Sequence, residues 1–282
     1  MKKKSLASLS SIKLSISLLF AFSIPPAFAE IAKEVAHEIK EVKTEIKAIK
    51  ENHTEKSLHW TYSGNEGPEF WGDLSANYTT CKIGRNQSPI DIKGSLLDAE
   101  LPAITFKYNM LTPSTIVNNG HTVQVNMWSG GEITVDNIKF KLKQFHFHTP
   151  SENKINGQSF PLEAHFVHLS DDNKIAVVAI LFSPGADDAT LTNLWKTLPM
   201  EKGDESKLDS HSLKPLEMEA KLSNYYRFNG SLTTPPCTEG VRWIVMKQPF
   251  HVSKQQVEKL QKALKQPNNR PVQPLNARVI IE

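Results

Sequence analysis

Apolar and polar residues alternate in short runs along the chain from residue 57 onward, with turn-forming residues between the runs. Period-two alternation is typical of strands that bury one face. Helical spacing is sparse, and its clearest example begins after Ser253, a residue type suited to capping a helix. The pattern predicts one strand-rich domain over residues 57–282. The expected strands include residues 115–117, 122–125, 133–135, 175–182 and 241–246, and the expected helices cover residues 191–198, 213–222 and 253–264.

Residues 30–56 differ from the rest, with dense Lys and Glu and no Gly, Pro, Phe, Tyr or Trp. Two sets of apolar residues recur every seven positions and interleave as the a and d positions of a heptad helix. The sets are Ala32, Ile39 and Ile46, and Val35, Val42 and Ile49. We interpret the segment as a charged heptad-like N-terminal helix or spacer. It could form a coiled coil in a homodimer or higher homo-oligomer, pack on its own domain, or stay a partly disordered spacer.

The first 29 residues have the organisation of a cleaved secretory signal peptide. Lysines at positions 2–4 precede a short apolar core at residues 14–22, and Ala27-Phe28-Ala29 forms a small-residue cleavage site. The alternative, a membrane anchor, is disfavoured because the apolar core is shorter than the roughly 20 residues that span a bilayer. The sequence therefore predicts a periplasmic or secreted protein without a membrane span.

Loss of this segment, with its four lysines, changes the formal net charge from +3 to −1. Such a balance gives no indication of a nucleic-acid or membrane-surface partner. An exported chain with two cysteines is also expected to form a disulfide, here between Cys81 and Cys237. Two buried free thiols are the alternative.

Candidate chemistry is concentrated in residues 144–152, Gln-Phe-His-Phe-His-Thr-Pro-Ser-Glu. His146 and His148 point to the same face of a strand because they are two residues apart. His165 lies in a second alternating run, and Asn156-Gly157, a dipeptide preferred in tight turns, lies between the runs. If the runs pair antiparallel, three histidines converge. Three neutral imidazoles with an open fourth position form a catalytic zinc site.

The parity of the two runs places further residues beside these histidines. Leu142 and Gln144 share the face of the first pair, and Glu163 and Val167 share the face of His165. Gln144 and Glu163 are then placed to accept hydrogen bonds from ligand histidines, which fixes the orientation of the rings. His168 has the opposite parity and is interpreted as structural.

A turn-rich loop at residues 229–237 contains Thr233. A threonine hydroxyl can accept a hydrogen bond from a metal-bound hydroxide while donating one to a carboxylate. Glu152 is a candidate for that carboxylate, although spacing alone does not bring the two together.

From about Leu58 to its C-terminus, the chain resembles an α-class carbonic anhydrase of the exported bacterial type. Several separate motifs match in the same order, which is more specific than any one of them. They are His59-Trp60, residues 87–92, Asn119-Gly120-His121, residues 144–152, residues 163–165, residues 230–236 and residues 270–275.

The resemblance implies a mixed, predominantly β domain around a large twisted, mostly antiparallel central sheet with short peripheral helices. It implies reversible, zinc-dependent hydration of CO2 to bicarbonate and a proton, by attack of zinc-bound hydroxide with a histidine as proton shuttle. His146, His148 and His165 would hold Zn2+. Thr233 would be the hydroxyl gatekeeper, oriented by Glu152.

The remaining site residues are also carried over from the resemblance. The implied substrate pocket consists of Val167, Val177, Leu232, Val241, Trp243 and Thr234. The implied proton path consists of the shuttle His121 with Tyr62, Asn119 and Gln124. Cys81 and Cys237 match the disulfide of exported relatives, and the Ser88–Pro89 and Pro235–Pro236 bonds match bonds that are cis in the family.

Two departures from the family pattern occur together. Asn153 stands where many relatives have His, and Phe228 stands where many have Tyr. Because those residues can hydrogen-bond each other in relatives, we expect a weaker or apolar substitute here, with an effect on local stability more than on catalysis.

A cupin-type metalloprotein is the alternative enzyme class, since the spacing of His146, His148 and Glu152 also fits the first cupin motif. Glu152 would then be a metal ligand. A cupin should supply a fourth ligand histidine in a later Gly- and Pro-containing motif, but no histidine follows residues 183–185 until His211. Zinc with three nitrogen ligands supports the first reading, and iron or manganese with a carboxylate supports the second.

The non-enzyme alternative is a binding module on the same fold with a decayed metal site. Decay would show as a replaced ligand histidine, whereas all three are present together with Thr233 and Glu152.

Overall fold

The computed structural model describes residues 59–94, 97, 101–102, 104–108, 111–209, 213 and 224–282, together with Lys40. Residues from 58 onward form one compact unit. The expected signal peptide lies outside the described residues, as do the heptad segment apart from Lys40 and the expected helix at 213–222 apart from Leu213. None of the described helices is both long and apolar enough to cross a bilayer.

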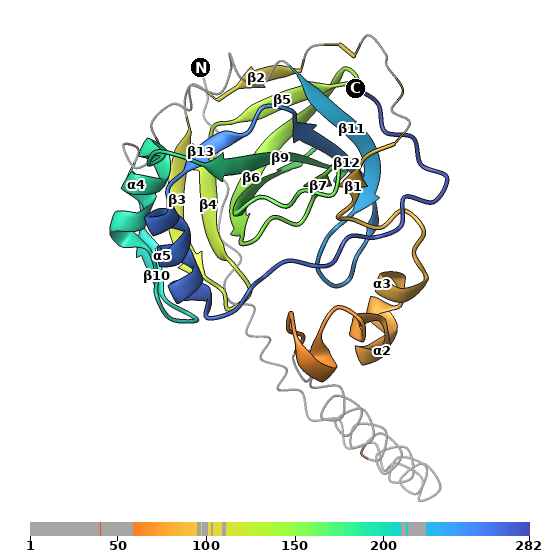
Figure 1. The fold of residues 1–282 in the computed structure, drawn as a ribbon, viewed down its shortest axis with the longest axis horizontal. Coiled ribbons are helices and arrows are strands. Elements are labelled where there is room, and N and C mark those ends of the chain that lie inside the picture. The colour runs from red at the N-terminus through yellow and green to blue at the C-terminus, as the bar shows by residue number, and fades with distance from the viewer. Residues whose placement is uncertain are drawn as a thin grey trace, which may run out of the picture. The chain divides into compact units, whose positions relative to one another are not determined.

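Most of the described regular structure belongs to an 11-stranded sheet with the order β10-β3-β4-β6-β8-β9-β12-β11 (Figure 1). The strand β13 pairs with β9, and β2 pairs with β5, which pairs with β6. All pairings in this sheet are antiparallel except those of β9 with β12 and β13. The expected predominantly β fold is confirmed. The strands are β1 (Asp91–Ile92), β2 (Thr105–Lys107), β3 (Thr112–Asn118), β4 (Val123–Ser129), β5 (Glu132–Val135), β6 (Ile138–His148), β7 (Lys154–Ile155), β8 (Leu162–Leu169), β9 (Ile175–Pro184), β10 (Glu205–Lys207), β11 (Tyr225–Ser231), β12 (Glu239–Met246) and β13 (Phe250–Val252).

The described helices are short, and α5 (Lys254–Leu264) is the longest. Ser253 is its N-cap, as the sequence predicts, and the structure adds a capping box, in which Ser253 accepts from the backbone nitrogen of Gln256 and the Gln256 side chain bonds back to residue 253. The helices α4 and α5 lie side by side (Figure 1), and Nε1 of Trp195 donates to the carbonyl of Gln256 at 3.0 Å. The others are α2 (Trp71–Leu74), α3 (Thr80–Ile83), α4 (Ala189–Leu194) and the 3-10 helices η1 (Gly64–Glu66), η2 (Ala76–Tyr78) and η3 (Trp195–Thr197).

The central sheet buries side chains on both faces, and β9 shows how. Its successive side chains alternate between two apolar clusters because strand side chains point to opposite faces. Ala176, Val178, Ile180 and Phe182 lie in the larger cluster, and Val177, Ala179 and Leu181 lie in the smaller one. The histidine-bearing face of β6 and β8 is the face of the smaller cluster.

One expectation about these faces is wrong. Leu142 belongs to the larger cluster, on the face opposite to Gln144 and the histidines. The register of β6 against β8 shifts between Leu142 and Gln144. A bulge adds one residue to one strand, so the side chains before the bulge point to the opposite face from the one that simple alternation predicts.

Candidate metal centre

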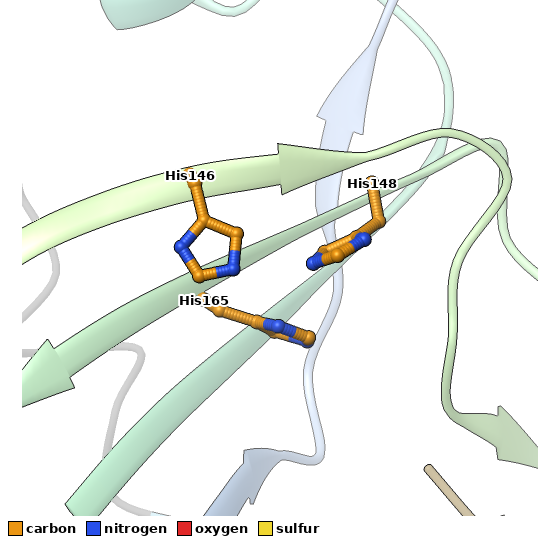
Figure 2. A group of neighbouring side chains, drawn as sticks. All are labelled: His146, His148 and His165. Atoms are coloured by element: carbon orange, nitrogen blue, oxygen red, sulfur yellow. The ribbon is translucent and has the colours of Figure 1, made fainter. Parts of the chain in front are cut away.

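The antiparallel pairing of β6 and β8 places His146 directly opposite His165, and His148 opposite Glu163. The three imidazoles converge (Figure 2), and one nitrogen from each lies within 4.8 Å of the others. Asn156-Gly157 forms a local turn, with both residues at positive φ, within the connection from β6 to β8. The strands therefore bring together the three histidines that the sequence singled out.

Each ring is held through one nitrogen. His146 donates from Nδ1 to the side-chain Oε1 of Gln144 at 2.8 Å, and His165 donates from Nε2 to Oε1 of Glu163 at 2.9 Å. Nδ1 of His148 donates to the backbone carbonyl of Asn268 at 2.7 Å. The ring nitrogens without a hydrogen bond among the described residues are Nε2 of His146, Nε2 of His148 and Nδ1 of His165. Such outer contacts fix the tautomer of a ligand histidine.

Electrostatics keep these rings neutral. Burial lowers the pKa of His146, His148 and His165, and for His146 and His165 the neighbouring imidazoles lower it further. Neutral imidazole is the protonation state that binds a metal. Nε2 of His148 is buried and has no hydrogen-bond partner among the described residues. An unpartnered buried nitrogen facing two other imidazoles fits a Zn2+ ligand set.

Glu163 is a buried acceptor for several donors besides His165. It accepts from the backbone nitrogens of Glu152 and Asn153 at 2.7 and 2.8 Å, and from Nδ2 of Asn153 at 2.7 Å. Burial raises the pKa of Glu163, and the hydrogen bonds from Asn153 oppose that effect. The carboxyl group thus joins one candidate ligand to the start of the β6–β8 connection.

Asn153 and Phe228, the two departures from the family pattern, both have contacts of their own. Oδ1 of Asn153 accepts from the backbone nitrogen of Ile90 at 3.1 Å, and its Nδ2 donates to Glu163. Phe228 stacks on Trp243 with the ring centroids 6.0 Å apart. A hydrogen-bonded amide and a stacked ring therefore stand where the family pattern has a His and a Tyr.

Glu152 is buried close to His148 and His165. Its Oε1 accepts from the backbone nitrogen of Arg270 at 2.8 Å. Burial raises the pKa of Glu152 to about 8, and interactions with Arg270 and with the Thr233 hydroxyl lower it. Oε2 has no hydrogen-bond partner among the described residues, and Thr233 is near enough to the carboxyl to lower its pKa. A cation bound by the histidines would favour the ionised carboxylate.

The group of converging ligand atoms contains the three histidines and not Glu152. Oε1 of Glu152 lies 3.5 Å from Nδ1 of His148, the nitrogen that is already bonded to Asn268. Its Oε2 lies 3.9 Å from Nδ1 of His165, so the carboxyl lies beside two of the histidines without joining the converging set, which argues against its role as a cupin-type ligand.

An apolar wall stands beside His165. The rings of Trp243 and His165 are nearly perpendicular, with their centroids 4.9 Å apart. The candidate pocket residues Val177, Val241 and Trp243 are buried in the smaller apolar cluster, and Val167 and Leu232 pack against it. Thr234, the remaining pocket candidate, is half-buried in the adjoining loop, where its carbonyl accepts from the backbone nitrogen of Cys237.

His121 lies on the turn between β3 and β4. Its ring stacks on Trp60, with centroids 3.8 Å apart and an angle of 13° between the planes. Burial lowers the pKa of His121 to about 4, and electrostatic interactions with Lys202 and His59 contribute.

The three other candidates for the proton path have different surroundings. Oδ1 of Asn119 accepts from the backbone nitrogens of His121 and Thr122, which shapes the turn. Gln124 lies opposite His146 in the sheet and donates to Asn126 at 2.6 Å. Tyr62 packs edge-on against Trp60, and burial raises its pKa.

Two predictions away from the metal centre are confirmed. Cys81 and Cys237 form a disulfide with their Cα atoms 5.0 Å apart. The Ser88–Pro89 and Pro235–Pro236 bonds are cis, and so is Thr149–Pro150, which was not expected. His168, interpreted as structural, is buried on the opposite face, where it hydrogen-bonds to the Tyr108 hydroxyl.

Asn268 is the residue that sequence reasoning missed. It contributes a backbone carbonyl to His148, and its side chain makes three further hydrogen bonds. The only sequence signal is its place shortly after the helix that begins beyond Ser253. A backbone acceptor leaves no mark in the sequence, because every residue type carries one.

Comparisons with known proteins agree on one family. A family profile described as eukaryotic-type carbonic anhydrase matches residues 66–282. A carbonic anhydrase of Neisseria gonorrhoeae is 47% identical over 237 residues, which are 82% of this chain and 89% of that protein. One of Pectobacterium carotovorum is 43% identical over 228 residues, covering 80% of this chain and 91% of the relative. The solved α-carbonic anhydrase of Thermovibrio ammonificans, in complex with the inhibitor sulfanilamide, superposes with a TM-score of 0.73 at 47% identity, covering 79% of this chain and 99% of that one.

Proposed function

The chain belongs to the carbonic anhydrase family, and on that premise we propose that it catalyses the reversible hydration of CO2 to bicarbonate and a proton. The observation that carries the proposal is the convergence of His146, His148 and His165, each with one nitrogen held and the other free. An apolar wall next to this donor set suits an apolar gas as substrate.

Zn2+ would be held by Nε2 of His146, Nε2 of His148 and Nδ1 of His165. When bound, the metal supplies a Lewis acid that brings the pKa of a water near neutrality, a property well known for carbonic anhydrase itself. The protein supplies neutral ligands, their fixed orientation and the groups around the reacting atoms.

Thr233 and Glu152 would orient the nucleophile. A threonine hydroxyl that donates to a carboxylate has only lone pairs left for other partners. The Thr233 oxygen would then accept the hydrogen of the attacking oxygen and turn a lone pair of that oxygen toward the substrate carbon. The backbone nitrogen of Arg270 keeps the Glu152 carboxyl in place for this task.

CO2 would lie against Val177, Val241 and Trp243, with Val167, Leu232 and Thr234 completing the pocket. Apolar side chains hold a molecule without a dipole and do not bind the charged product equally well, which favours release of bicarbonate.

His121 would carry the proton to solvent, along a path lined by Tyr62, Asn119 and Gln124. A shuttle works best with a pKa near the working pH. The stacked ring, with its pKa of about 4, is too buried for that, so we propose that it accepts the proton after leaving Trp60 for a more hydrated position.

We further propose that residues 1–29 direct export and are removed, that the catalytic domain covers residues 57–282, and that residues 30–56 act as a spacer or an oligomerising helix. N-terminal sequencing of the exported protein should find Glu30 first. Sizing the chain from Glu30 against one that begins at Ser57 should show whether residues 30–56 change the oligomeric state.

Stopped-flow measurement of CO2 hydration, before and after a chelator removes the metal, tests the catalytic proposal. We expect activity that disappears with the metal and returns with Zn2+. His165→Ala should lose zinc and activity together, whereas the matched control His251→Ala, at an exposed position on β13, should keep both. A folded, zinc-loaded protein without activity would contradict the proposal.

A further inference from the structure

The segment that follows α5 contacts two of the groups proposed to act at the metal centre, His148 and Glu152. The backbone carbonyl of Asn268 accepts from His148, and two residues later the backbone nitrogen of Arg270 donates to Glu152. These two contacts use backbone atoms. They therefore depend on the path of the chain and not on the side chain at position 268.

The side chain of Asn268 makes a separate set of bonds. Its Nδ2 donates to the carbonyl of Phe147 at 2.8 Å and to the carbonyl of His121 at 3.0 Å, and its Oδ1 accepts from the backbone nitrogen of Thr149 at 2.9 Å. Phe147 lies between the two histidines of β6. The amide, only 1% exposed, thus joins the ligand-bearing strand to the backbone of His121.

Thr122 makes a direct hydrogen bond between the β3–β4 turn and the strand β6. Its hydroxyl donates to the Phe147 carbonyl at 2.6 Å, the same oxygen that Asn268 contacts. The β3–β4 turn is therefore bonded to the end of β6 both directly and through Asn268.

Asn118, a second asparagine, bonds the β3–β4 turn to the helix α5. Nδ2 of Asn118 donates to the carbonyl of Ala263, in the last turn of α5, at 3.0 Å. Its Oδ1 accepts from the backbone nitrogen of Gly120 at 3.0 Å. Asn118 is buried, so both polar ends of its amide are satisfied inside the protein.

From these contacts we propose that Asn268 is a positioning residue, whose side chain sets the distance of the His121 backbone from the ligand strand, with Asn118 supporting the turn from α5. The inference rests on the proposed role of His121 as the proton shuttle. In this proposal the backbone carbonyl of Asn268 orients the metal ligand His148, and the side-chain amide of Asn268 positions the shuttle His121.

The division has a measurable consequence. A substitution at position 268 keeps the carbonyl that accepts from His148 but removes the amide that contacts His121. Proton transfer should then suffer while metal binding and CO2 conversion are retained. A residue that only stabilised the fold would affect all of them together.

Asn268→Asp is the main variant, because it keeps the shape and an acceptor for Thr149 but replaces the donor to His121. Asn268→Ala is the second variant and introduces no charge. Asn118→Ala tests the support from α5 independently, should both changes at 268 prevent folding. Gln261→Ala is the matched control, since Gln261 bonds to the Thr149 hydroxyl at 3.3 Å but has no bond to the turn.

Each purified holoenzyme is measured by stopped flow in weak buffer and with added imidazole, together with its zinc content. We expect kcat in weak buffer to fall by between about 3-fold and about 100-fold in the Asn268 variants, the upper bound being the cost of a misplacement of about 1 Å. kcat/KM and zinc content should stay near those of the parent protein, and imidazole should restore kcat. Hydrogen exchange should show faster exchange of the amides at residues 119–122.

Parallel measurement of His121→Ala separates the two hypotheses. If His121→Ala keeps full turnover in weak buffer, the shuttle assignment is wrong and the positioning role falls with it. If His121→Ala is slow while the folded Asn268 and Asn118 variants match the Gln261→Ala control, the shuttle stands and the positioning role is overturned. A parallel loss of kcat, kcat/KM and zinc in the Asn268 variants would also overturn it.

Discussion

Glu163 binds Nε2 of His165 at 2.9 Å, and this bond makes Nδ1 the free nitrogen of that ring. In His146 and His148 the opposite nitrogen, Nδ1, is held, and Nε2 is free. The three candidate ligands therefore do not present the same atom. The difference comes from the partner that each strand position provides, because the ring nitrogen that donates to an outer acceptor is not available to a metal.

Glu163→Gln should weaken zinc binding. The glutamine NH2 group cannot accept, so at least one of the donors from Glu152, Asn153 and His165 would lose its partner. We expect the affinity for zinc to fall by about 10- to 100-fold, as is usual when an outer partner of a ligand is lost. Competition with a chelator of known affinity measures it. Unchanged affinity would show that Glu163 does not orient His165.

His121→Ala should slow turnover in weak buffer, because the nearest titratable carrier at the turn is gone. Imidazole added at high concentration should restore the rate, since it can accept the proton from solution. Stopped-flow rates at several buffer concentrations provide the check. Turnover at the parental rate in weak buffer would exclude His121 as the shuttle.

Lys202→Gln should raise the pKa of His121 from about 4 toward its ordinary value. The Lys202 side chain lies against the turn, where a Cβ added at Gly120 would come within 2.6 Å of its Cδ, and its charge lowers the pKa of His121. Removing a positive charge makes protonation of the imidazole easier. An NMR titration of the ring measures the pKa, and Lys174→Gln, on the loop before β9, is the control. The same titration curve in both variants would contradict the prediction.

His168 should make the protein sensitive to acid. Burial lowers its pKa to about 4, below the ordinary 6.5, so the unfolded chain binds one more proton between these values. The free energy of unfolding should therefore fall as the pH drops from 6.5 to 4, by up to about 1.4 kcal/mol per pH unit for this group.

Replacement of the buried imidazole tests that dependence. His168→Gln keeps an acceptor for the Tyr108 hydroxyl but has no titrating ring, so its free energy of unfolding should change less over this range. Urea unfolding of both metal-free proteins at several pH values gives the two slopes. Equal slopes would assign the acid sensitivity to other groups.

Loss of the disulfide should destabilise the catalytic domain. Cys81 and Cys237 are 156 positions apart, so the bond removes much conformational freedom from the unfolded chain. The Cys81→Ser, Cys237→Ser double variant should lose about 2–5 kcal/mol of unfolding free energy. Denaturant unfolding measures it, and the parent protein under reducing conditions is the control. A loss below the error of the measurement would show that the bond adds nothing to stability.

The sequence by itself determined the features that depend on neighbours along the chain. The i, i+2 spacing of His146 and His148 predicted that both lie on one face of a strand, and the alternation around His165 identified it as the third candidate ligand. Ser253 marked the start of α5 in the same way. These predictions succeeded because strand and helix periodicity are properties of local backbone geometry.

Only the tertiary structure decided the features that join distant parts of the chain. The bulge after Leu142 depends on the pairing of β6 with β8, and the bond from His148 to Asn268 spans 120 positions. Local spacing carries no information on which distant backbone carbonyl will face a ring, because that depends on how the whole sheet and the segment after α5 pack together. For this reason the sequence could indicate which histidines meet, while the fold decided which nitrogen each of them presents and what holds it there.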